Sequence, residues 1–257
     1  MEILRPTCSG RRLGEAVSSS TTYSSLFRPG SHPEGLESHL AEFTATAGSS
    51  DFPCVFAPMA LRKDELLFGV GDVTKDGWGV AVMLMDLAAE AIWEDPDQVV
   101  VLWFDGIESA TLDDDHAAFR QILLTLLEAG GEWPAEAPVD PADPRWNFWY
   151  KGIDFFINVS TRHHRLRRSR NLGHAFTLVV QSRASFDRLP VAATAARRQI
   201  RRRISTYDGV GLSPHLGTHG DAPELPQYFL GDSNGCPYAA ITAQDVTAHV
   251  NTTQGRA

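Results

Sequence analysis

The sequence predicts a single domain of the α/β or α+β class, built on a mixed sheet flanked by helices. Apolar runs of strand length alternate with amphipathic segments of helix length along most of the chain. With 257 residues, 43% of them hydrophobic, the chain can also bury one large core without disulfides. Residues 1–35 are rich in Ser, Thr, Gly and Pro. We therefore expect a flexible N-terminal arm over 1–35 and the folded domain over 36–257.

Helical patterns occur in four segments of the chain. The expected helices cover residues 36–47, 78–92, 113–129 and 191–206. Pro96 ends the second helix, because the residue before a proline avoids helical geometry. The acidic run Asp113–Asp115 suits the start of the third helix, since negative groups are stabilised at a helix N-terminus. Gly130 closes that helix, and a proline-rich connection follows it.

Strand patterns are shorter and rich in β-branched and aromatic residues. The expected strands cover residues 99–104, 153–159, 175–181 and 228–230. The first of these, Val99 to Phe104, is apolar throughout and predicts a strand buried on both faces. The run Phe52–Ala57 fits either a strand or the wall of a pocket.

The charge of the chain is unevenly distributed. Residues 151–207 carry 13 Lys and Arg against 2 Asp and Glu, whereas the remainder carries 10 against 30. A protein with a net charge of −9 and one basic segment is not expected to bind nucleic acid. The basic segment is expected to face a small anionic ligand or the acidic remainder of the fold.

Membrane and cysteine signals are both weak. No segment approaches the roughly 18 apolar residues that cross a bilayer, and the N-terminus lacks a signal-peptide pattern. We expect a cytoplasmic protein without membrane contact. Cys8, Cys54 and Cys236 form no CxxC pair and no CxxCH, so zinc ribbons, thioredoxin chemistry and covalent haem attachment lack support.

The stretch from Trp146 to Gly173 is the most informative part of the sequence. An aromatic run and an apolar strand lead into a loop that holds His163, His164 and five arginines. Aromatic side chains form rigid apolar walls, imidazoles bind metals, and guanidinium groups bind carboxylates as forks. A flat apolar cofactor with an iron centre and acidic tails needs this combination. The stretch therefore predicts a haem pocket.

His164 is the first candidate for the iron ligand and the catalytic centre. Nearby positive charge opposes protonation of its imidazole, and a neutral imidazole is the form that binds iron. The ordinary alternative is a solvated or loop-capping histidine. His163 is the neighbouring candidate. Cys54 could ligate iron as a thiolate, although its apolar neighbours favour a buried structural thiol.

The arginines and two further histidines supply the remaining candidates. The proposed clamps for haem propionates or a substrate carboxylate are Arg165, Arg167, Arg168 and Arg170. Their alternative is an arginine-rich surface loop, in which at least one guanidinium would need an anionic partner. His215 and His219 could hold zinc but lack a third ligand at a typical spacing. No G-x-G-x-x-G follows a strand, so no nucleotide cofactor site is expected.

The chain resembles the YqcI/YcgG family over roughly residues 50–235. The resemblance rests on blocks in a fixed order rather than on any single motif. These blocks are Phe52–Cys54, Trp149–Gly152, Phe155–Ser160, Arg167–Gly173, Phe176-Thr177, Gln181–Arg183, Phe186-Asp187, Arg203-Ile204, Tyr207-Asp208, Gly220-Asp221 and Gln227–Leu230.

The resemblance implies a haem-dependent N-oxygenase that hydroxylates the guanidine nitrogen of L-arginine, as in antibiotic biosynthesis of the D-cycloserine type. It implies haem b and O₂. Since no nucleotide cofactor site is expected, the electrons must come from a separate reductase, or peroxide must replace them. The iron ligand of the family falls on His164, but His163 stands where a smaller residue is expected, which leaves the ligand open by one position. Asp154 and Glu224 are nominated to hold the guanidinium. A homodimer is also expected. The alternatives are N-oxygenation of another basic amino acid such as lysine, and a haem-binding sensor without oxygenase activity.

Overall fold

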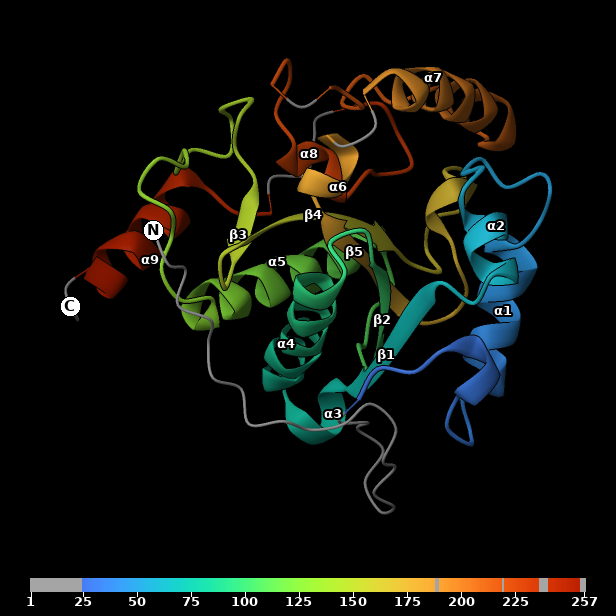
Figure 1. Ribbon diagram of the computed structural model, residues 1–257, viewed down its shortest axis with the longest axis horizontal. Coiled ribbons are helices and arrows are strands. Elements are labelled where there is room, and N and C mark those ends of the chain that lie inside the picture. The colour runs from blue at the N-terminus through green and yellow to red at the C-terminus, as the bar shows by residue number, and fades with distance from the viewer. Residues whose placement is uncertain (1–24, 188–189, 219, 236–239, 255–257) are drawn as a thin grey trace.

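The computed structural model describes residues 25–187, 190–218, 220–235 and 240–254. Within them, one mixed sheet carries helices on both faces (Figure 1). The strands are β1 (Leu66–Asp72), β2 (Val99–Asp105), β3 (Phe148–Tyr150), β4 (Ile153–Ser160) and β5 (Phe176–Ser182). Their order in the sheet is β1-β2-β5-β4-β3, and only β1 and β2 run parallel to each other. The predicted mixed sheet flanked by helices is confirmed.

Helices connect these strands and cover the sheet. The helical segments are η1 (Pro29–Ser31), α1 (Glu37–Ala47), α2 (Ala57–Arg62), α3 (Val73–Asp76), α4 (Gly79–Glu94), α5 (Leu112–Ala129), η2 (Arg168–Arg170), α6 (Ala184–Asp187), α7 (Pro190–Tyr207), α8 (Leu225–Tyr228) and α9 (Ala243–Gln254). The parallel pair β1 and β2 is joined by α3 and α4, as a parallel connection requires.

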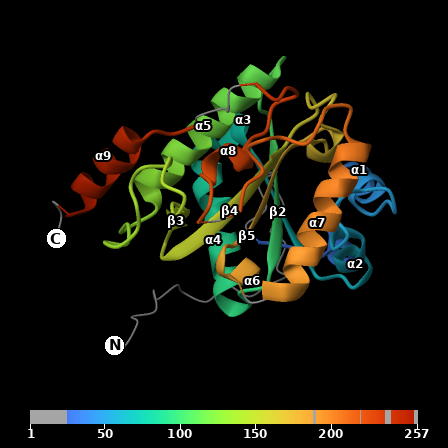
Figure 2. The same ribbon diagram turned by 90° about the horizontal axis from the view of Figure 1, so that it is seen from above.

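Side-chain alternation along β2 divides the interior into two layers. Val100, Leu102 and Phe104 pack in one apolar cluster with residues of α4 and α5. Val101 and Trp103 belong to a second cluster with residues of α1. Successive strand residues point to opposite faces of a sheet, so a continuous apolar run such as β2 must be covered on both sides. The helices accordingly lie on either side of the sheet in both views (Figure 1, Figure 2).

The pairing of the strands gathers several chain ends at one edge of the sheet. β5 is antiparallel to both neighbours, and Phe176 near its start pairs with Phe104 near the end of β2. On the other side, Thr177 pairs with Ser160, the last residue of β4. The segments that follow β2 and β4, and the segment that precedes β5, therefore lie together. The candidate functional residues come from these segments.

The start of α5 lies at the same edge and is fixed by a capping box. The side chain of Thr111 accepts a hydrogen bond from the backbone N–H of Asp114 at 3.2 Å, and the Asp114 carboxylate accepts one from the Thr111 N–H at 3.0 Å. This reciprocal pattern satisfies two free helix N–H groups. It confirms the helix start expected from the acidic run. The next residue, Asp115, is buried.

Most predicted elements are confirmed, and the predicted strand over residues 228–230 is wrong. Residues 228–230 do not form a strand: Tyr228 ends the single helical turn α8, and its hydroxyl donates to the carbonyl of Phe155 at 2.7 Å. The run Phe52–Ala57 forms turns that lead into α2 rather than a strand. The sequence also gave no expectation of β1, whose apolar pattern is interrupted by Gly69 and Gly71, or of α9.

The expected N-terminal arm is partly packed against the sheet. Leu26 and Phe27 are buried, and Phe27 exchanges two backbone hydrogen bonds with Phe68 of β1, at 2.8 and 2.9 Å. Two large apolar side chains gain enough from burial to hold this segment. Residues 1–24 of the expected arm lie outside the described residues.

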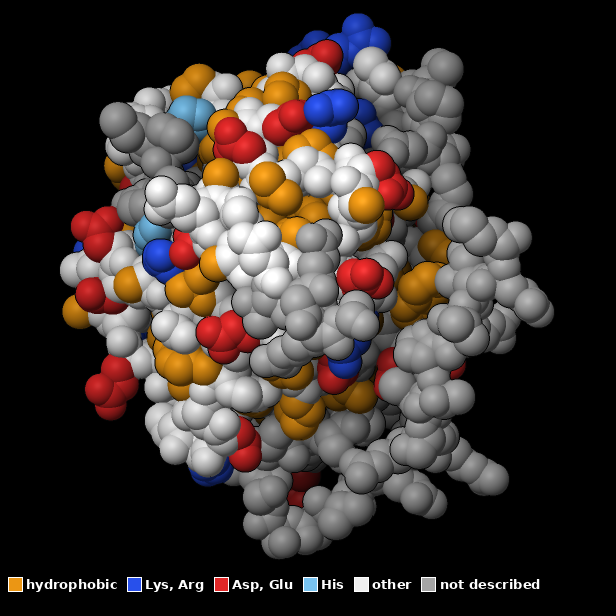
Figure 3. Space-filling model, turned by 90° about the vertical axis from the view of Figure 1, so that its left-hand side faces the viewer, with side chains coloured by type: hydrophobic (Ala, Val, Ile, Leu, Met, Phe, Trp, Pro, Cys, Tyr) orange, Lys and Arg blue, Asp and Glu red, His pale blue; other side chains and the backbone are white. Residues whose placement is uncertain are grey.

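The described surface agrees with the uneven charge of the sequence. On the face shown in Figure 3, acidic side chains are scattered among few basic ones. This is the distribution expected when the basic residues concentrate between 151 and 207. Across the described part of the chain, no helix combines the length and the apolar character that a membrane span requires.

A glycine in β1 sets the distance between the sheet and α4. A β-carbon at Gly71 would lie 2.0 Å from Cγ2 of Val80, a stiff β-branched side chain. Overpacking of this kind costs about 1–3 kcal/mol, so Gly71→Ala should lower the free energy of unfolding by that amount in urea denaturation. Gly79→Ala is the control, because a β-carbon there meets no atom within 4 Å. Equal losses in the two variants would contradict this packing.

Candidate functional site

The arginine-rich loop is organised around a carboxylate from the C-terminal part of the chain. The backbone N–H groups of Arg165, Leu166 and Arg167 donate to the Asp232 carboxylate at 2.8, 2.9 and 2.8 Å. Burial alone would raise the pKa of Asp232, but these three hydrogen bonds outweigh it and the pKa is lowered. Asp232 therefore binds the backbone of the loop, whereas the anionic partner expected for a guanidinium is Asp208, which pairs with Arg167.

Arg167 is buried and holds the loop to the same C-terminal segment. Its Nε donates to the carbonyl of Gly231 at 2.7 Å, and its Nη2 donates to Oδ1 of Asn234 at 2.9 Å. A carboxylate oxygen of Asp208 lies 3.8 Å from Nη1. Only 1% of the Arg167 residue is exposed. Its guanidinium is thus engaged within the protein.

Arg170 has a similar position one turn further along. Its guanidinium donates to the carbonyls of Gln227 and Tyr228 at 2.8 and 3.0 Å. Burial, with repulsion from the nearby Arg167, lowers the pKa of Arg170 to about 9. A charged group in such a place is stabilised only by good hydrogen bonds. Arg170 therefore ties η2 to the helical turn α8.

The other two candidate arginines lie at the surface. Arg165 is exposed. Arg168 is also exposed, and its guanidinium lies over the ring of Tyr207, 4.8 Å from the ring centroid, and donates to the Tyr207 carbonyl. The four arginines thus do not converge on one anion: two serve the interior of the loop and two face outward.

His164 is buried and both of its ring nitrogens have protein partners. Nε2 donates to the carbonyl of Leu230 at 2.8 Å, and Nδ1 accepts from the hydroxyl of Thr161 at 3.2 Å. Burial lowers the pKa of His164 to about 4, so the imidazole is neutral, as expected from the sequence. An iron bond to His164 would require one of these two hydrogen bonds to break.

The surroundings of His164 do not fit haem as they stand. A cavity of about 120 Å³ is lined by Thr161 and Arg162 beside this loop, and His164 is not among its lining residues. Pockets for drug-sized ligands occupy about 300–1,000 Å³, and haem is a large ligand. Haem ligation by His164 stays a prediction that requires this loop to open.

The other metal-ligand candidates lie apart from one another. His163 donates from Nδ1 to the Asp115 carboxylate at 2.8 Å, at the edge of the sheet described above. Cys54 is a partly buried free thiol beside the second apolar cluster. His215 is partly buried in a turn. His219 lies outside the described residues.

The two carboxylates nominated for the guanidinium do not line this cavity either. Asp154 accepts a hydrogen bond from the hydroxyl of Ser182 at 3.1 Å. Burial raises the pKa of Asp154. Glu224 is fully buried and lies 3.2 Å from the guanidinium of Arg183. Both acids stabilise the fold around β4, β5 and α8.

The cavity lies at the edge of the sheet where the strand ends meet. Its charged and polar lining includes the side chains of Asp105, Asp115, Arg162 and His174. Arg162 extends from the end of β4 and donates to the carbonyl of Ser109 at 3.1 Å. Two carboxylates, a guanidinium and an imidazole therefore surround one small space. Ligand sites are common at the carboxyl ends of parallel strands, and β2 ends here.

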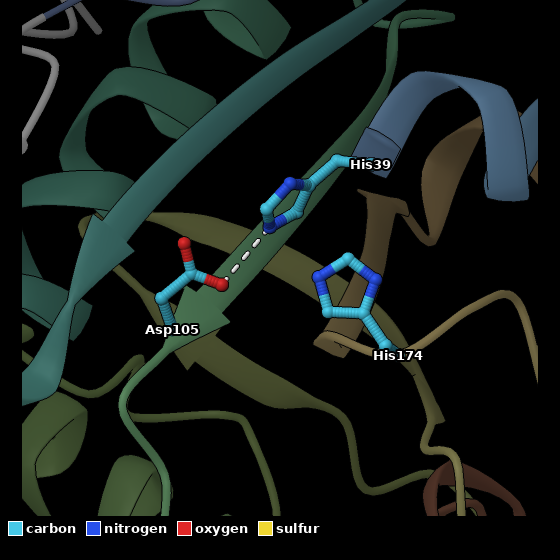
Figure 4. A group of neighbouring side chains, drawn as sticks. All are labelled: His39, Asp105 and His174. Carbon is cyan, nitrogen blue, oxygen red and sulfur yellow. Dashed lines mark hydrogen bonds and ion pairs between the residues drawn. The ribbon is translucent and has the colours of Figure 1, made fainter. Parts of the chain in front are cut away.

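Two of these lining residues join a histidine from α1 in a compact group (Figure 4). His39 donates from Nε2 to Oδ1 of Asp105 at 2.9 Å, and the ring centroids of His39 and His174 lie 4.6 Å apart. One potential ligand atom from each of His39, Asp105 and His174 lies within 4.8 Å of the others. No pattern in the sequence indicates this group. The three residues are far apart in the chain, so no local spacing could have indicated it.

Glu42 orients one member of the group. Its Oε2 accepts hydrogen bonds from Nδ1 and from the backbone N–H of His174, at 2.8 and 2.7 Å. Gly173 permits this approach, because a β-carbon there would lie 2.9 Å from the same Glu42 oxygen. Burial would raise the pKa of Glu42, but the hydrogen bonds from His174 lower it. This contact places a hydrogen on Nδ1 of His174, the ring nitrogen that faces Glu42.

The comparison with known proteins agrees with the resemblance described above. Residues 43–239 match the YqcI/YcgG family. This chain belongs to that family. No solved structure matches the chain.

Three relatives illustrate the relationship. DcsA of Streptomyces lavendulae, provisionally named an Nω-hydroxy-L-arginine synthase, is 32% identical over 206 residues, which are 73% of this chain and 77% of DcsA. YqcI of Bacillus subtilis (strain 168) is 34% identical over 49% of this chain and 54% of its own length. YcgG of the same organism is 31% identical over 79% and 86%. The family prediction is therefore confirmed.

The low pKa of His164 predicts a loss of stability in acid. The imidazole titrates near 6.5 when unfolded and near 4 when folded, so between these values the unfolded chain binds more protons. The contribution is full above about pH 6.5 and falls by up to about 3 kcal/mol toward pH 4. Urea denaturation of the wild type and His164→Gln should show a stability difference that narrows as the pH falls. A stability difference that does not change with pH would contradict the lowered pKa of His164.

The two kinds of arginine predict different costs of substitution. Arg170→Lys should lower the free energy of unfolding by about 3 kcal/mol or more, because an ammonium cannot reach both carbonyls and each buried unsatisfied group costs about 1–3 kcal/mol. Arg168→Lys, two residues away on the surface, should cost about 1 kcal/mol or less. Chemical denaturation measures both, and similar losses would show that Arg170 is not an interior clamp.

Proposed function

We propose that this chain is an N-hydroxylating oxygenase that converts L-arginine to Nω-hydroxy-L-arginine. In this reaction one N–H of the guanidine becomes N–OH. One atom of O₂ enters the product, and the other leaves as water after taking up two electrons and two protons. The electrons come from an external donor, such as a separate reductase.

The charge pattern of the cavity carries this proposal. Asp115 contributes a buried carboxylate to the cavity, and Arg162 contributes a guanidinium of opposite charge. An amino acid with a cationic side chain carries the complementary pair, a guanidinium and an α-carboxylate. Carboxylate and guanidinium groups pair through two parallel hydrogen bonds. The relationship to DcsA adds support for arginine as the substrate.

The size and rigidity of the cavity suit a side-chain group. A cavity of about 150 Å³ holds a benzene-sized molecule, and the present cavity of about 120 Å³ is slightly smaller. The hydrogen bond from His163 fixes one oxygen of Asp115. Its other oxygen is the one that a guanidinium would bind. A preorganised carboxylate of this kind binds without first having to be ordered.

Oxygen activation requires a redox-active group that the chain itself does not supply. Haem, flavin, copper and non-haem iron are the groups that support O₂ chemistry in proteins. Haem b was expected from the family resemblance, and the residues around His164 would have to rearrange to accept it. The proposed substrate contacts do not depend on which iron centre is used.

The reaction itself gives the first test. The purified chain, loaded with ferrous ion or separately with haem b, is incubated with L-arginine, a chemical reductant and isotopically heavy O₂. Mass spectrometry should detect Nω-hydroxy-L-arginine that carries one heavy oxygen, and L-lysine should give no product. Hydroxylated lysine in place of hydroxylated arginine would reassign the substrate. No hydroxylated product under either loading would contradict the proposal.

A pair of variants tests the role of Asp115. Asp115→Asn should raise the KM for L-arginine about tenfold or more, because a hydrogen bond to a charged group contributes about 1.5–3 kcal/mol. Glu108→Gln is the control: this exposed acid lies in the connection that leads into α5 and does not line the cavity. Steady-state kinetics should show an unchanged KM in the control. An unchanged KM in both variants would remove Asp115 from the substrate site.

A further inference from the structure

We propose that His39, Asp105 and His174 bind one divalent transition-metal ion, and that ferrous iron is the ion that best matches this site. The inference stands on side-chain geometry and does not rest on the proposed reaction. It places a metal at the edge of the sheet, away from His164.

Three different elements bring the ligands together. His39 projects from α1, Asp105 is the last residue of β2, and His174 lies just before β5. In Figure 4 the side chains of Asp105 and His174 point toward the ring of His39. Metal–nitrogen and metal–oxygen bonds of about 2.0–2.2 Å place ligand atoms roughly 3–4 Å apart. The three ligand atoms lie within 4.8 Å of one another, so small rotations of the side chains would bring them to bonding distance from one ion.

The contact with Glu42 is an independent observation that points to a metal. Histidines that bind metals commonly donate their second ring N–H to a carboxylate, which fixes the tautomer and makes the ligand more basic. His174 has this arrangement: Nδ1 donates to Glu42, and its other ring nitrogen faces Asp105 and His39 (Figure 4). The side chain of His174 is 44% exposed, so this group lies open to solvent.

A metal ion would replace the hydrogen in the hydrogen bond between His39 and Asp105. The imidazole of His39 is only 8% exposed, and its Nε2 donates to Asp105. A cation at this position would bind both atoms after the hydrogen on Nε2 is released. Metal binding that displaces a proton weakens as the pH falls. This coupling gives the site a signature that a purely structural ion pair lacks.

The ligand set indicates the kind of metal. Two imidazoles and one carboxylate with open positions are the arrangement that holds ferrous iron in non-haem oxygenases. Asp105 and His174 also line the cavity, so the open positions of the ion would face that space. Zinc accepts the same ligand types. The alternative to a metal site is that the hydrogen bond between His39 and Asp105 serves only to stabilise the fold.

Metal binding by the full-length chain tests the proposal directly. The protein is stripped with a chelator and titrated without oxygen, first with Fe²⁺ and then with Co²⁺, whose visible absorption reports nitrogen and oxygen ligands. One ion per chain, bound more weakly as the pH falls, is expected from metal analysis and the absorption titration. A stripped wild-type protein that binds neither Fe²⁺ nor Co²⁺ would overturn the proposal.

Variants locate the ion within the chain. His174→Ala and His39→Gln should each weaken binding at least about a hundredfold, and Glu42→Gln should weaken it about 10–100-fold as a positioning residue. His249→Ala is the control, because His249 lies in α9 and contacts Gly131. Circular dichroism confirms that each variant is folded. Binding that survives both ligand substitutions places the ion elsewhere and overturns the site.

The outcome is separable from that of the hydroxylation assay. Iron bound by these residues, without hydroxylated product, would support the metal site and remove the proposed reaction. Hydroxylated arginine from a protein whose iron content is unaffected by His174→Ala would support the reaction and overturn the metal site.

Discussion

The antiparallel pairing of β2 with β5 is the constraint on which the site depends. Its register places Phe104 opposite Phe176, so Asp105 at the end of β2 and the residues just before β5 must meet. Asp105 and His174 thereby become neighbours although many residues separate them. The second partner of β5, β4, ends at the same edge and brings Arg162 and His163 to it. The cavity is a consequence of this register.

The arginine-rich loop contributes to the site by holding its shape. Interior guanidinium groups donate to backbone carbonyls, and Asp232 accepts from three backbone amides. Each of these contacts joins the loop to the C-terminal segment. A buried charge is tolerated only where such hydrogen bonds surround it. The buried guanidinium groups of this loop therefore require its many polar contacts. With the loop fixed, Arg162 lines the cavity, and His163 is held in its hydrogen bond to the lining residue Asp115.

Much of the fold could be predicted from the sequence, and the candidate site could not. The continuous apolar run of β2, the apolar run of β4 and the acidic start of α5 indicate their elements locally, so these three elements were expected. Glycines interrupt the pattern of β1, and a single turn such as α8 has no pattern to detect. The neighbouring arginines indicate His164 as a candidate ligand in the sequence, whereas no pattern predicts its hydrogen bond to the carbonyl of Leu230. The group of His39, Asp105 and His174 is created by strand pairing and helix packing alone.

Anomalous X-ray diffraction from crystals grown with Fe²⁺, recorded at the iron absorption edge, tests the metal centre most directly. If the edge of the sheet is the functional centre, the anomalous map contains one strong peak within bonding distance of His39, Asp105 and His174. A peak beside His164, with the Leu230 hydrogen bond broken, would contradict this assignment and return the centre to the arginine-rich loop. A map without a peak would contradict both positions.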